Sequence, residues 1–246
     1  MADPTPIPAA TVIVMREVPS GPPELLMVER AAAMSFAPGA IVFPGGRIDP
    51  GDRTLAATLP GDADDLAGRI AAIRETIEEA SVGIGLDLSP ASLDAVRRRL
   101  SEGEPIAAAL AGAPLALDAL VPFARWLPLG LQHKVFDTRF YIARAPVNAA
   151  PMVDGSENVR LFWATAQAVL DLADDGQVAI LFPTRRNLER LAQFATFDAA
   201  VADANARPIR IITPWIEARG GVDHLCIPDE AGYPVTAEPM RQVRRT

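Results

Sequence analysis

Residues 66–80 constrain the fold of this chain more than any other segment. Apolar residues recur there at intervals of four, three and four, at Leu66, Ile70, Ile73 and Ile77. This spacing predicts an amphipathic helix with one face buried in a core. Because an α-helix turns by about 100° per residue, Glu75, Glu78 and Glu79 share the opposite face. The sequence thus predicts a helix anchored by its apolar side and crowded with carboxylates on the other.

The three carboxylates require either full solvation or a bound cation. Like charges three and four residues apart on a helix repel by several tenths of a kcal/mol per pair, roughly. A ligand set made only of oxygen suits Mg²⁺ or Mn²⁺, which neutralise a diphosphate and lower the pKa of a bound water. Arg74 is able to orient one carboxylate through a fork-shaped hydrogen bond. The alternative is an ordinary helix whose glutamates face solvent.

A strand that ends in a double glycine precedes this helix. Ala40–Phe43 is a short apolar run, and Gly45 and Gly46 follow Pro44. Glycine permits backbone conformations and close ligand approach that other residues do not. A main-chain carbonyl at this turn is therefore a candidate oxygen ligand, and the order of strand, turn and acidic helix favours a metal site over a solvated face.

Together the two segments resemble the box of the Nudix hydrolases, G-x5-E-x7-R-E-U-x-E-E-x-G-U, in which U is apolar. Residues 74–82 match its second half, except that Ser81 replaces a glycine and Thr76 an aliphatic residue. In the first half, counted from Gly46, Asp52 stands where the family has glutamate. Between this aspartate and the arginine lie 21 residues instead of seven, so the resemblance implies an insertion of 14 residues.

An interrupted box is similar to the coenzyme A diphosphatase branch of the family, the type of mammalian Nudix motif 19. Residues 30–31 and 36–46 look like the R-[SA] and G-x3-F-P-G-G elements of that branch, although Ser35 departs from the basic residue expected there. Further similar segments are 125–128, 135–140 and 182–184. The likeness spans about residues 11–197.

The resemblance implies a set of catalytic and metal-binding residues. Metal ligands would be Glu75, Glu78, Glu79 and the carbonyl of Gly46, with Mg²⁺ as the cofactor and Mn²⁺ as its substitute. Arg74, Glu75 and Glu78 would act in catalysis. The spacing independently supports the three carboxylates on one face, but it leaves open which of them is base and which is ligand.

Further candidates come from the need for positive charge around a polyanionic substrate. Substrate contacts are predicted for Arg30, Arg47 and Arg139, together with Phe43 of the motif. Arg144 is a further candidate. Late in the chain, Glu157 is predicted to assist catalysis, because a late acidic residue assists the metal or the water in relatives.

The implied reaction is hydrolysis of a diphosphate linkage, with coenzyme A or an acyl derivative as the expected substrate. The products would be 4′-phosphopantetheine, or its acyl form, and adenosine 3′,5′-bisphosphate. Two alternatives stay open. One is another nucleoside diphosphate derivative, such as a dinucleotide, a nucleotide sugar or ADP-ribose. The other is a non-catalytic module that senses a nucleotide.

Composition and motif counts restrict the remaining functions. A net charge of −8 argues against a protein built to bind nucleic acid, and the one cysteine, Cys226, allows no intrachain disulfide. His133 and His224 lack metal-ligand spacing, and there is no G-x4-G-K-[ST] phosphate loop. No apolar run approaches the ~18 residues of a membrane span. We expect a cytoplasmic enzyme with a small-molecule substrate and no membrane partner, and a homodimer is compatible with the family resemblance.

The expected fold class is α/β, a Nudix α/β/α sandwich with a mixed sheet between helices and extra helices after the box. We expect a flexible tail over residues 1–10, one domain over 11–235 and a second tail over 236–246. Residues 51–65 are predicted to be an inserted loop and 89–120 a helical insertion. Strands are predicted at 11–18, 24–30, 40–43, 135–143, 159–164, 209–212 and 224–227. Helices are predicted at 66–80, from 90 onward, at 165–173 and at 187–204.

Overall fold

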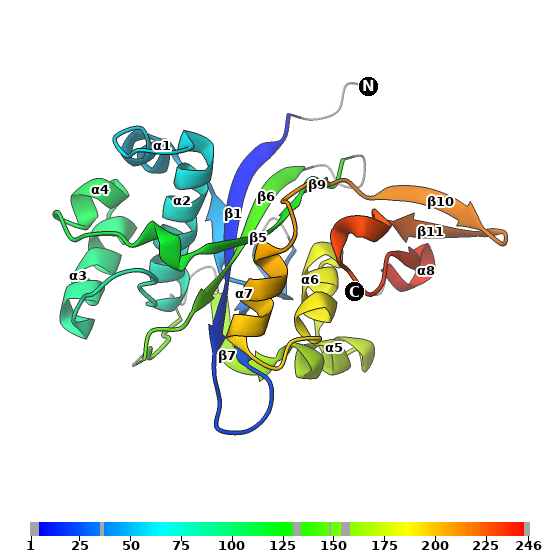
Figure 1. Ribbon diagram of the computed structural model, residues 1–246. Helices are drawn as coiled ribbons and strands as arrows, with labels where there is room; N and C mark the ends of the chain where they lie inside the picture. Colours follow the sequence, from blue (N-terminus) through cyan, green and yellow to red (C-terminus); the bar gives the residue numbers. More distant parts are fainter. Residues whose placement is uncertain (1–4, 35–36, 130–133, 148, 154–157, 244–246) are drawn as a thin grey trace.

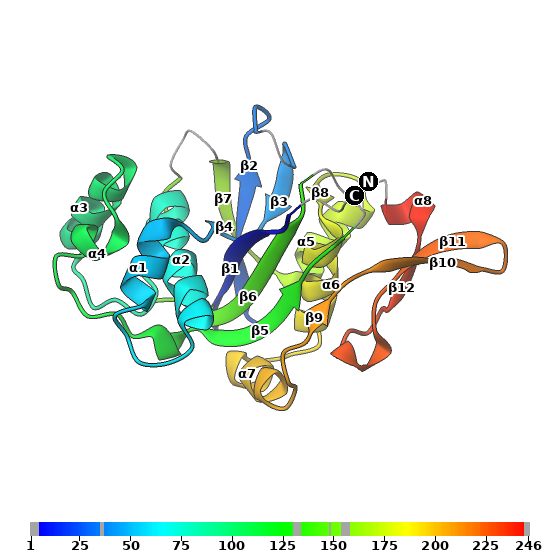
Figure 2. The same cartoon turned by 90° about the horizontal axis from the view of Figure 1, so that it is seen from above.

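The computed structural model describes residues 5–34, 37–129, 134–147, 149–153 and 158–243. Its centre is a mixed sheet in the order β8-β3-β2-β1-β6-β5-β9, with β4 paired to β1 and β7 to β2. Helices cover both faces of this sheet, as Figures 1 and 2 show. The predicted α/β sandwich with a mixed sheet is confirmed. Among the described residues, no helix is both long and apolar enough to cross a membrane.

The main sheet contains β1 Ile7–Arg16, β2 Glu24–Arg30, β3 Ala40–Val42, β4 Gly45–Arg47, β5 Val121–Trp126, β6 Phe136–Arg144, β7 Asn158–Thr165, β8 Ala179–Ile180 and β9 Ile211–Ile212. A second sheet contains β10 Trp215–Arg219, β11 Val222–Cys226 and β12 Ala237–Pro239. The α-helices are α1 Pro50–Ala56, α2 Ala63–Ala80, α3 Pro90–Ser101, α4 Ile106–Ala109, α5 Ala166–Asp174, α6 Phe182–Leu191, α7 Phe197–Asn205 and α8 Met240–Val243.

The central strand β1 is apolar on both faces, because each face packs against a separate core. Ile13 and Met15 join the cluster beneath α5, α6 and α7, whereas Val12 and Val14 join the cluster beneath α2. Successive side chains of a strand point to opposite faces, so a strand buried on both sides reads as a continuous apolar run. β1 also pairs in parallel with β6 from Ile7 to Met15, which fixes the middle of the sheet.

Helix α2 confirms the amphipathic pattern of residues 66–80. Ile70, Ile73 and Ile77 are fully buried against the sheet. The helix begins earlier than predicted, because the Asp62 carboxylate accepts hydrogen bonds from the first-turn backbone N–H groups. It ends at Ser81, whose φ of 54° and ψ of 37° are left-handed. This conformation favours glycine, which is the residue that the Nudix box carries at this position.

The prediction that residues 51–65 form an inserted loop is wrong. Helix α1 starts directly after Asp49, with Pro50 in its first turn, and the start of α2 takes up residues from 63 onward. The backbone N–H of Asp49 donates to the Asp52 carboxylate at 2.8 Å. A helix start with an acidic cap and a proline was present in the sequence, but the polar composition of the segment concealed it.

The predicted long helix at 187–204 is two helices. α6 starts at Phe182 and ends at Leu191, and α7 starts after Thr196. The hydroxyl of Thr196 accepts a hydrogen bond from the Ala199 N–H, which marks a new helix start. The apolar spacing was continuous because both helices bury apolar residues in the same core.

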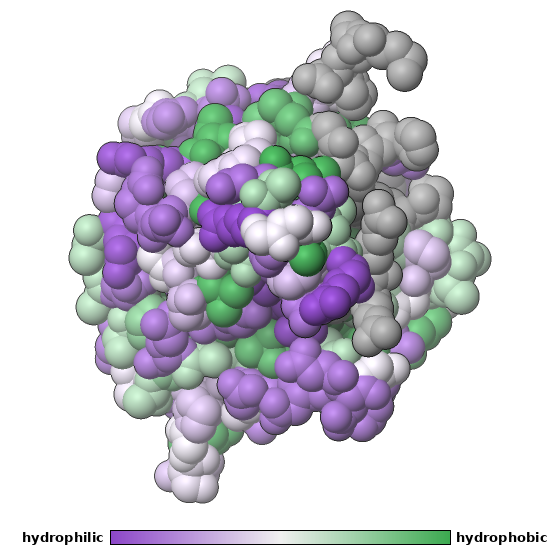
Figure 3. Space-filling view, turned by 90° about the vertical axis from the view of Figure 1, so that its right-hand side faces the viewer, coloured by the Kyte–Doolittle hydropathy of each residue, from purple (hydrophilic) through white to green (hydrophobic). Residues whose placement is uncertain are grey.

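Both predicted tails are partly structured. β1 already begins at Ile7, so the first ordered strand overlaps the predicted flexible segment 1–10. Residues 237–243 of the predicted tail 236–246 form β12 and α8, and β12 pairs with β11. The β10–β11 hairpin projects from the body of the molecule (Figures 1 and 2). Figure 3 faces this side, where apolar and hydrophilic residues are interspersed.

Candidate active site

A cavity of about 1360 Å³ brings together the segments that the sequence singled out. Its acidic part is lined by Glu75, Glu78 and Glu79 of α2 and by Asp49, next to Gly45 and Gly46 of β4. One wall is the face of β1 and β6 that carries Thr11, Thr138 and Phe140. The lining also has an apolar part, which includes three residues from the C-terminal part of the chain: Leu225, Met240 and Val243.

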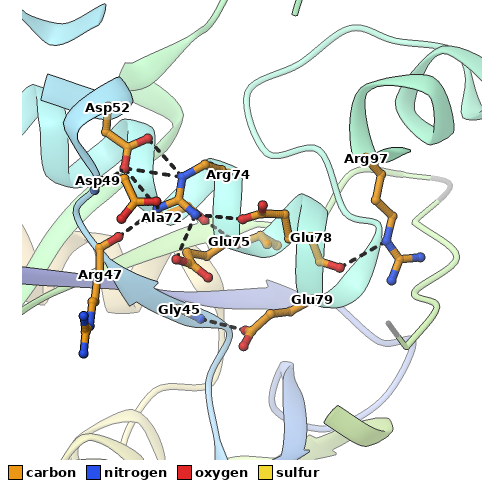
Figure 4. Close-up of polar contacts among 11 residues, drawn as sticks. Gly45, Arg47, Asp49, Asp52, Ala72, Arg74, Glu75, Glu78, Glu79 and Arg97 are labelled. Atoms are coloured by element: carbon orange, nitrogen blue, oxygen red, sulfur yellow. Dashed lines mark hydrogen bonds and ion pairs between the residues drawn. The ribbon is translucent and has the colours of Figure 1, made fainter. Parts of the chain in front are cut away.

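Arg74 organises the acidic part of the cavity (Figure 4). Its guanidinium donates hydrogen bonds to Asp52 at 3.0 and 3.1 Å, to Glu75 at 2.9 Å and to Glu78 at 2.7 Å. It also donates to the carbonyl of Arg47 at 2.8 Å. One buried arginine therefore joins α1, β4 and two carboxylates of α2.

The contact between Asp52 and Arg74 joins two positions that are far apart in the sequence. The Asp52 side chain is fully buried and lies against the guanidinium of Arg74, although 21 residues separate the two in sequence. The rest of α1 and the first turns of α2 form the connection between the two residues, so positions that are distant in sequence are in contact here. Asp52 thus meets the box arginine although it is shorter than the glutamate of the family motif.

Two glycines are required at positions 45 and 46, because the backbone of β4 lies very close to β1 and α2 there. The backbone N–H of Gly45 donates to the Glu79 carboxylate at 3.0 Å. A Cβ atom at Gly46 would overlap the Glu75 carboxylate, and one at Gly45 would overlap the Thr11 side chain and the Ala10 carbonyl. Any larger residue at Gly46 would displace the Glu75 carboxylate. Glycine at this position therefore lets the backbone of β4 lie directly against the carboxylates of α2.

The carboxylates of α2 are difficult to ionise in the protein alone. Burial raises the pKa of Glu75 to about 8, and the charges of Glu79 and Glu78 add to this, while Arg74 opposes it. Burial also raises the pKa of Glu78, against the neighbouring guanidinium. Burial lowers the pKa of Arg74. The hydrogen bond to Asp52 and the charges of the surrounding carboxylates raise this pKa by more, so the guanidinium stays charged. The site therefore carries carboxylates that a divalent cation would stabilise in their charged form.

The donor set fits a hard divalent cation by its chemistry. The available groups are carboxylate oxygens and backbone carbonyls, which Mg²⁺ and Mn²⁺ prefer. Among the described residues, no group of three acidic, histidine or cysteine side chains converges as it stands to hold an ion. The reason is visible in the contacts: Arg74 holds Glu75 and Glu78, and the Gly45 N–H holds Glu79. A cation would have to exchange places with these donors.

The predicted substrate-binding residues separate into two groups. Arg30, Phe43 and Arg47 line the cavity. Arg139 does not, because β6 turns Thr138 and Phe140 toward the cavity and Arg139 toward Gly68 of α2. The prediction for Arg139 is therefore wrong, for the alternation of a strand sends neighbouring residues to opposite faces.

The other candidates lie away from the cavity or outside the described residues. Arg144 stacks on Phe197 and pairs with Asp198 at 2.8 Å, so it does not line the cavity. Ser35, His133 and Glu157 lie outside the described residues.

Two parts of the cavity were missed by the sequence analysis. Helix α3 contributes Arg97 and Arg98, for which the run of three arginines at 97–99 was an available signal. The C-terminal segment contributes Met240 and Val243, and no apolar period in that segment of the sequence indicates them. The only lysine of the chain, Lys134, also lines the cavity.

Comparison with known proteins finds Nudix hydrolases among similar sequences and structures. No protein-family model matches the chain. The chain is similar to "Putative nudix hydrolase 7" of Caenorhabditis elegans, with 26% identity over 190 residues, which are 74% of this chain. These residues cover 60% of that relative, so the chain spans less than two thirds of its length. The crystal structure of a NUDIX hydrolase from Alicyclobacillus acidocaldarius superimposes with a TM-score of 0.71 and 27% identity, over 80% of this chain and 96% of the other.

Proposed function

We propose that this protein, a member of the Nudix hydrolase superfamily, hydrolyses the diphosphate linkage of a nucleoside diphosphate derivative with the help of a divalent cation. The observation that carries the proposal is the network in which Arg74 joins Asp52, Glu75 and Glu78 beside the double glycine. A structural ion-pair network has no need for a fourth carboxylate, yet the buried Glu79 lies beside it against β4.

The chain's own groups would bind the metal and position the reacting water. Glu75, Glu78, Glu79 and the Gly46 carbonyl would hold Mg²⁺, with Mn²⁺ as its substitute. When bound, the ion neutralises charge on the diphosphate and lowers the pKa of a water. Arg74 orients Glu75 and Glu78, one carboxylate of the trio accepts the proton of the attacking water, and Arg30 and Arg47 at the rim bind phosphate oxygens. Glu157 stays a candidate to assist this step.

The favoured substrate is coenzyme A or an acyl-coenzyme A. Two observations support it. The segment that is similar to the coenzyme A diphosphatase branch contributes Arg30 and Phe43 to the cavity. The apolar part of the cavity lining includes Leu225 and Met240 from the C-terminal part of the chain, and such side chains suit a pantetheine or acyl chain. A dinucleotide, a nucleotide sugar or ADP-ribose would use the same acidic site, but would leave this apolar part without a matching group.

A non-catalytic nucleotide sensor is the proposal from another class. It would keep the cavity and lack metal-dependent turnover. The carboxylate trio favours catalysis, because three acidic side chains at the cavity of a protein that only binds a nucleotide would repel its phosphates. We further propose a cytoplasmic protein that acts on a small molecule, without a nucleic-acid or membrane partner, and homodimerisation is compatible with this proposal.

The test is Mg²⁺-dependent hydrolysis of a substrate panel with products identified by mass. The panel contains coenzyme A, acetyl-coenzyme A, NADH, ADP-ribose and diadenosine polyphosphates, run beside Glu78→Gln. We expect adenosine 3′,5′-bisphosphate from the coenzyme A compounds with the wild type. Products from the other members alone would exclude coenzyme A as the substrate while keeping the hydrolase. No turnover of any member would favour the sensor.

A further inference from the structure

Helix α3 presents a polar stripe to the cavity. Four polar residues of α3 line the cavity at the helical spacing i, i+3, i+4 and i+7, together with the apolar Leu100: Asp94, Arg97, Arg98 and Ser101. Val96, on the opposite side of the helix, is buried in the core beneath α2, and Leu100 is buried in the same core where it borders the cavity. Packing of the apolar side therefore fixes which side chains face the cavity, and two of them are cationic.

Arg97 lies directly against the acidic helix. Its Nε donates to the backbone carbonyl of Glu78 at 3.1 Å, so the guanidinium sits beside the last turn of α2 (Figure 4). Within the described residues, neither of its terminal nitrogens has a hydrogen-bond or ion-pair partner. Donors that face a cavity in this way are available to a ligand, and a guanidinium matches the paired oxygens of a phosphate.

Arg98 and Arg99 differ in the hydrogen-bond and ion-pair partners of their side chains. The Arg98 side chain is exposed at the cavity and makes no hydrogen bond or ion pair with the described residues. By contrast, Arg99 pairs with Glu104 at 2.7 Å and donates to the carbonyl of Ala109 at 3.0 Å. Three consecutive arginines thus divide into one that holds the α3–α4 turn and two whose donors face the cavity.

The charges around the cavity point to an anion at this position. A diphosphate substrate brings several negative charges next to the carboxylates of α2, and a bound cation offsets only part of them. Arg74 is fully engaged with protein groups. In the alternative interpretation Arg97 only caps the end of α2, because arginines often donate hydrogen bonds to the last carbonyls of a helix. That role does not account for Arg98.

We propose that Arg97 and Arg98 form an anion subsite on α3 that binds a phosphate group of the substrate. This inference rests on the proposed function, since it names the part of the same substrate, a phosphate group, that α3 contacts. The ligand class is a phosphorylated nucleotide or a pyrophosphate, held by charge-assisted hydrogen bonds beside the metal-binding face.

The experiment is calorimetric titration with pyrophosphate in EDTA and low salt, which requires no turnover. Compared with the wild type, Arg98→Gln should bind about threefold more weakly and Arg97→Gln/Arg98→Gln about tenfold more weakly. Arg99→Gln removes the same charge from the same helix and should keep the wild-type affinity. Equal affinity in all four proteins, or no binding to the wild type, would overturn the proposal.

A second readout distinguishes binding from a structural role. With whichever substrate the enzyme turns over, Arg98→Gln should raise KM about threefold with kcat nearly unchanged, and its Tm should equal that of the wild type. A fall in Tm with KM unchanged would overturn the subsite in favour of a structural arginine. If hydrolysis fails for all substrates, the pyrophosphate titration still decides the subsite, so the two proposals fail separately.

Discussion

The Asp52 carboxylate and the Arg74 guanidinium form a buried ion pair at 3.0 Å, although 21 residues separate them in the sequence. Asp52 is fully buried and the Arg74 side chain is 9% exposed, so neither charge has water as a substitute partner. The pair joins α1 to α2 and at the same time fixes the guanidinium that holds Glu75 and Glu78. Stability and the geometry of the acidic site therefore depend on the same contact.

Replacing one member of this pair should lower the stability of the protein and disturb the geometry of the acidic site. We expect Asp52→Asn to lower the free energy of unfolding by about 3 kcal/mol, because it leaves a buried guanidinium without its main counter-charge. Urea unfolding measures this. The matched control is Asp64→Asn, which breaks the exposed pair with Arg53 at 3.0 Å and should cost less than about 1 kcal/mol. Equal losses in the two variants would show that burial does not govern the Asp52 contact.

The raised pKa of Glu75 predicts a pH-dependent stability in the metal-free protein. The folded state keeps the Glu75 proton up to about pH 8, whereas the unfolded chain releases it near the ordinary glutamate pKa of 4.5. Between these values the folded state binds more protons, so its stability falls as the pH rises through this window. We expect the loss attributable to Glu75 to be roughly 2–4 kcal/mol.

Unfolding in EDTA between pH 5 and roughly 8.5 tests this, with Glu75→Gln as the comparison. The advantage of the variant over the wild type should grow as the pH rises. Added Mg²⁺ should reverse the trend in the wild type, because the ion stabilises the charged carboxylate. A constant difference between the two proteins across the range would contradict the prediction.

Ser81 predicts a stabilising substitution. It ends α2 in the left-handed conformation, with φ of 54°, and within the described residues its buried hydroxyl has no hydrogen-bond partner. Ser81→Gly removes both costs and should raise stability by about 1 kcal/mol, or ~3 °C in Tm. Ser81→Ala removes only the hydroxyl and should gain less. Scanning calorimetry that finds glycine no better than alanine would refute the conformational part of this explanation.

Gly46 predicts a loss of activity with little change in the fold. A methyl group there would overlap the Glu75 carboxylate, so Gly46→Ala should move that carboxylate away from the metal. We expect kcat to fall by about 100-fold and the Mg²⁺ requirement to rise. Gly51→Ala is the matched control, because a Cβ there meets only Pro105 at 3.3 Å. Steady-state kinetics with full activity in Gly46→Ala would contradict the close approach of β4 and α2.

Local periodicity predicted the parts of the site that lie on one element. The stripe of α2 determined which face the carboxylates occupy, because burial of Ile70, Ile73 and Ile77 leaves no other orientation. The contact between Asp52 and Arg74 was beyond this reasoning, since the path of a 21-residue connection depends on how α1 packs against α2. The sequence predicted which residues stand at the two ends of the box, but not the distance between them.

The wrong predictions share a physical cause. Arg139 and Thr138 are neighbours on β6, and only the placement of β6 beside β1 decides which of them faces the cavity. The C-terminal segment has no strong apolar period, yet β12 forms by pairing with β11 and α8 packs beside it. Short strands and helices of this kind depend on tertiary partners that local patterns do not encode.

The most direct test of the central claim is the rate of hydrolysis of the substrate found in the panel, measured against Mg²⁺ concentration for the wild type and for Glu79→Gln. We predict saturable activation by Mg²⁺ in the wild type, no turnover in EDTA, and a loss of at least about 100-fold in kcat for the variant, with its Tm within a few degrees of the wild type. Turnover that persists in EDTA, or a Glu79→Gln enzyme with wild-type rates, would contradict a metal-dependent hydrolase built on this carboxylate cluster.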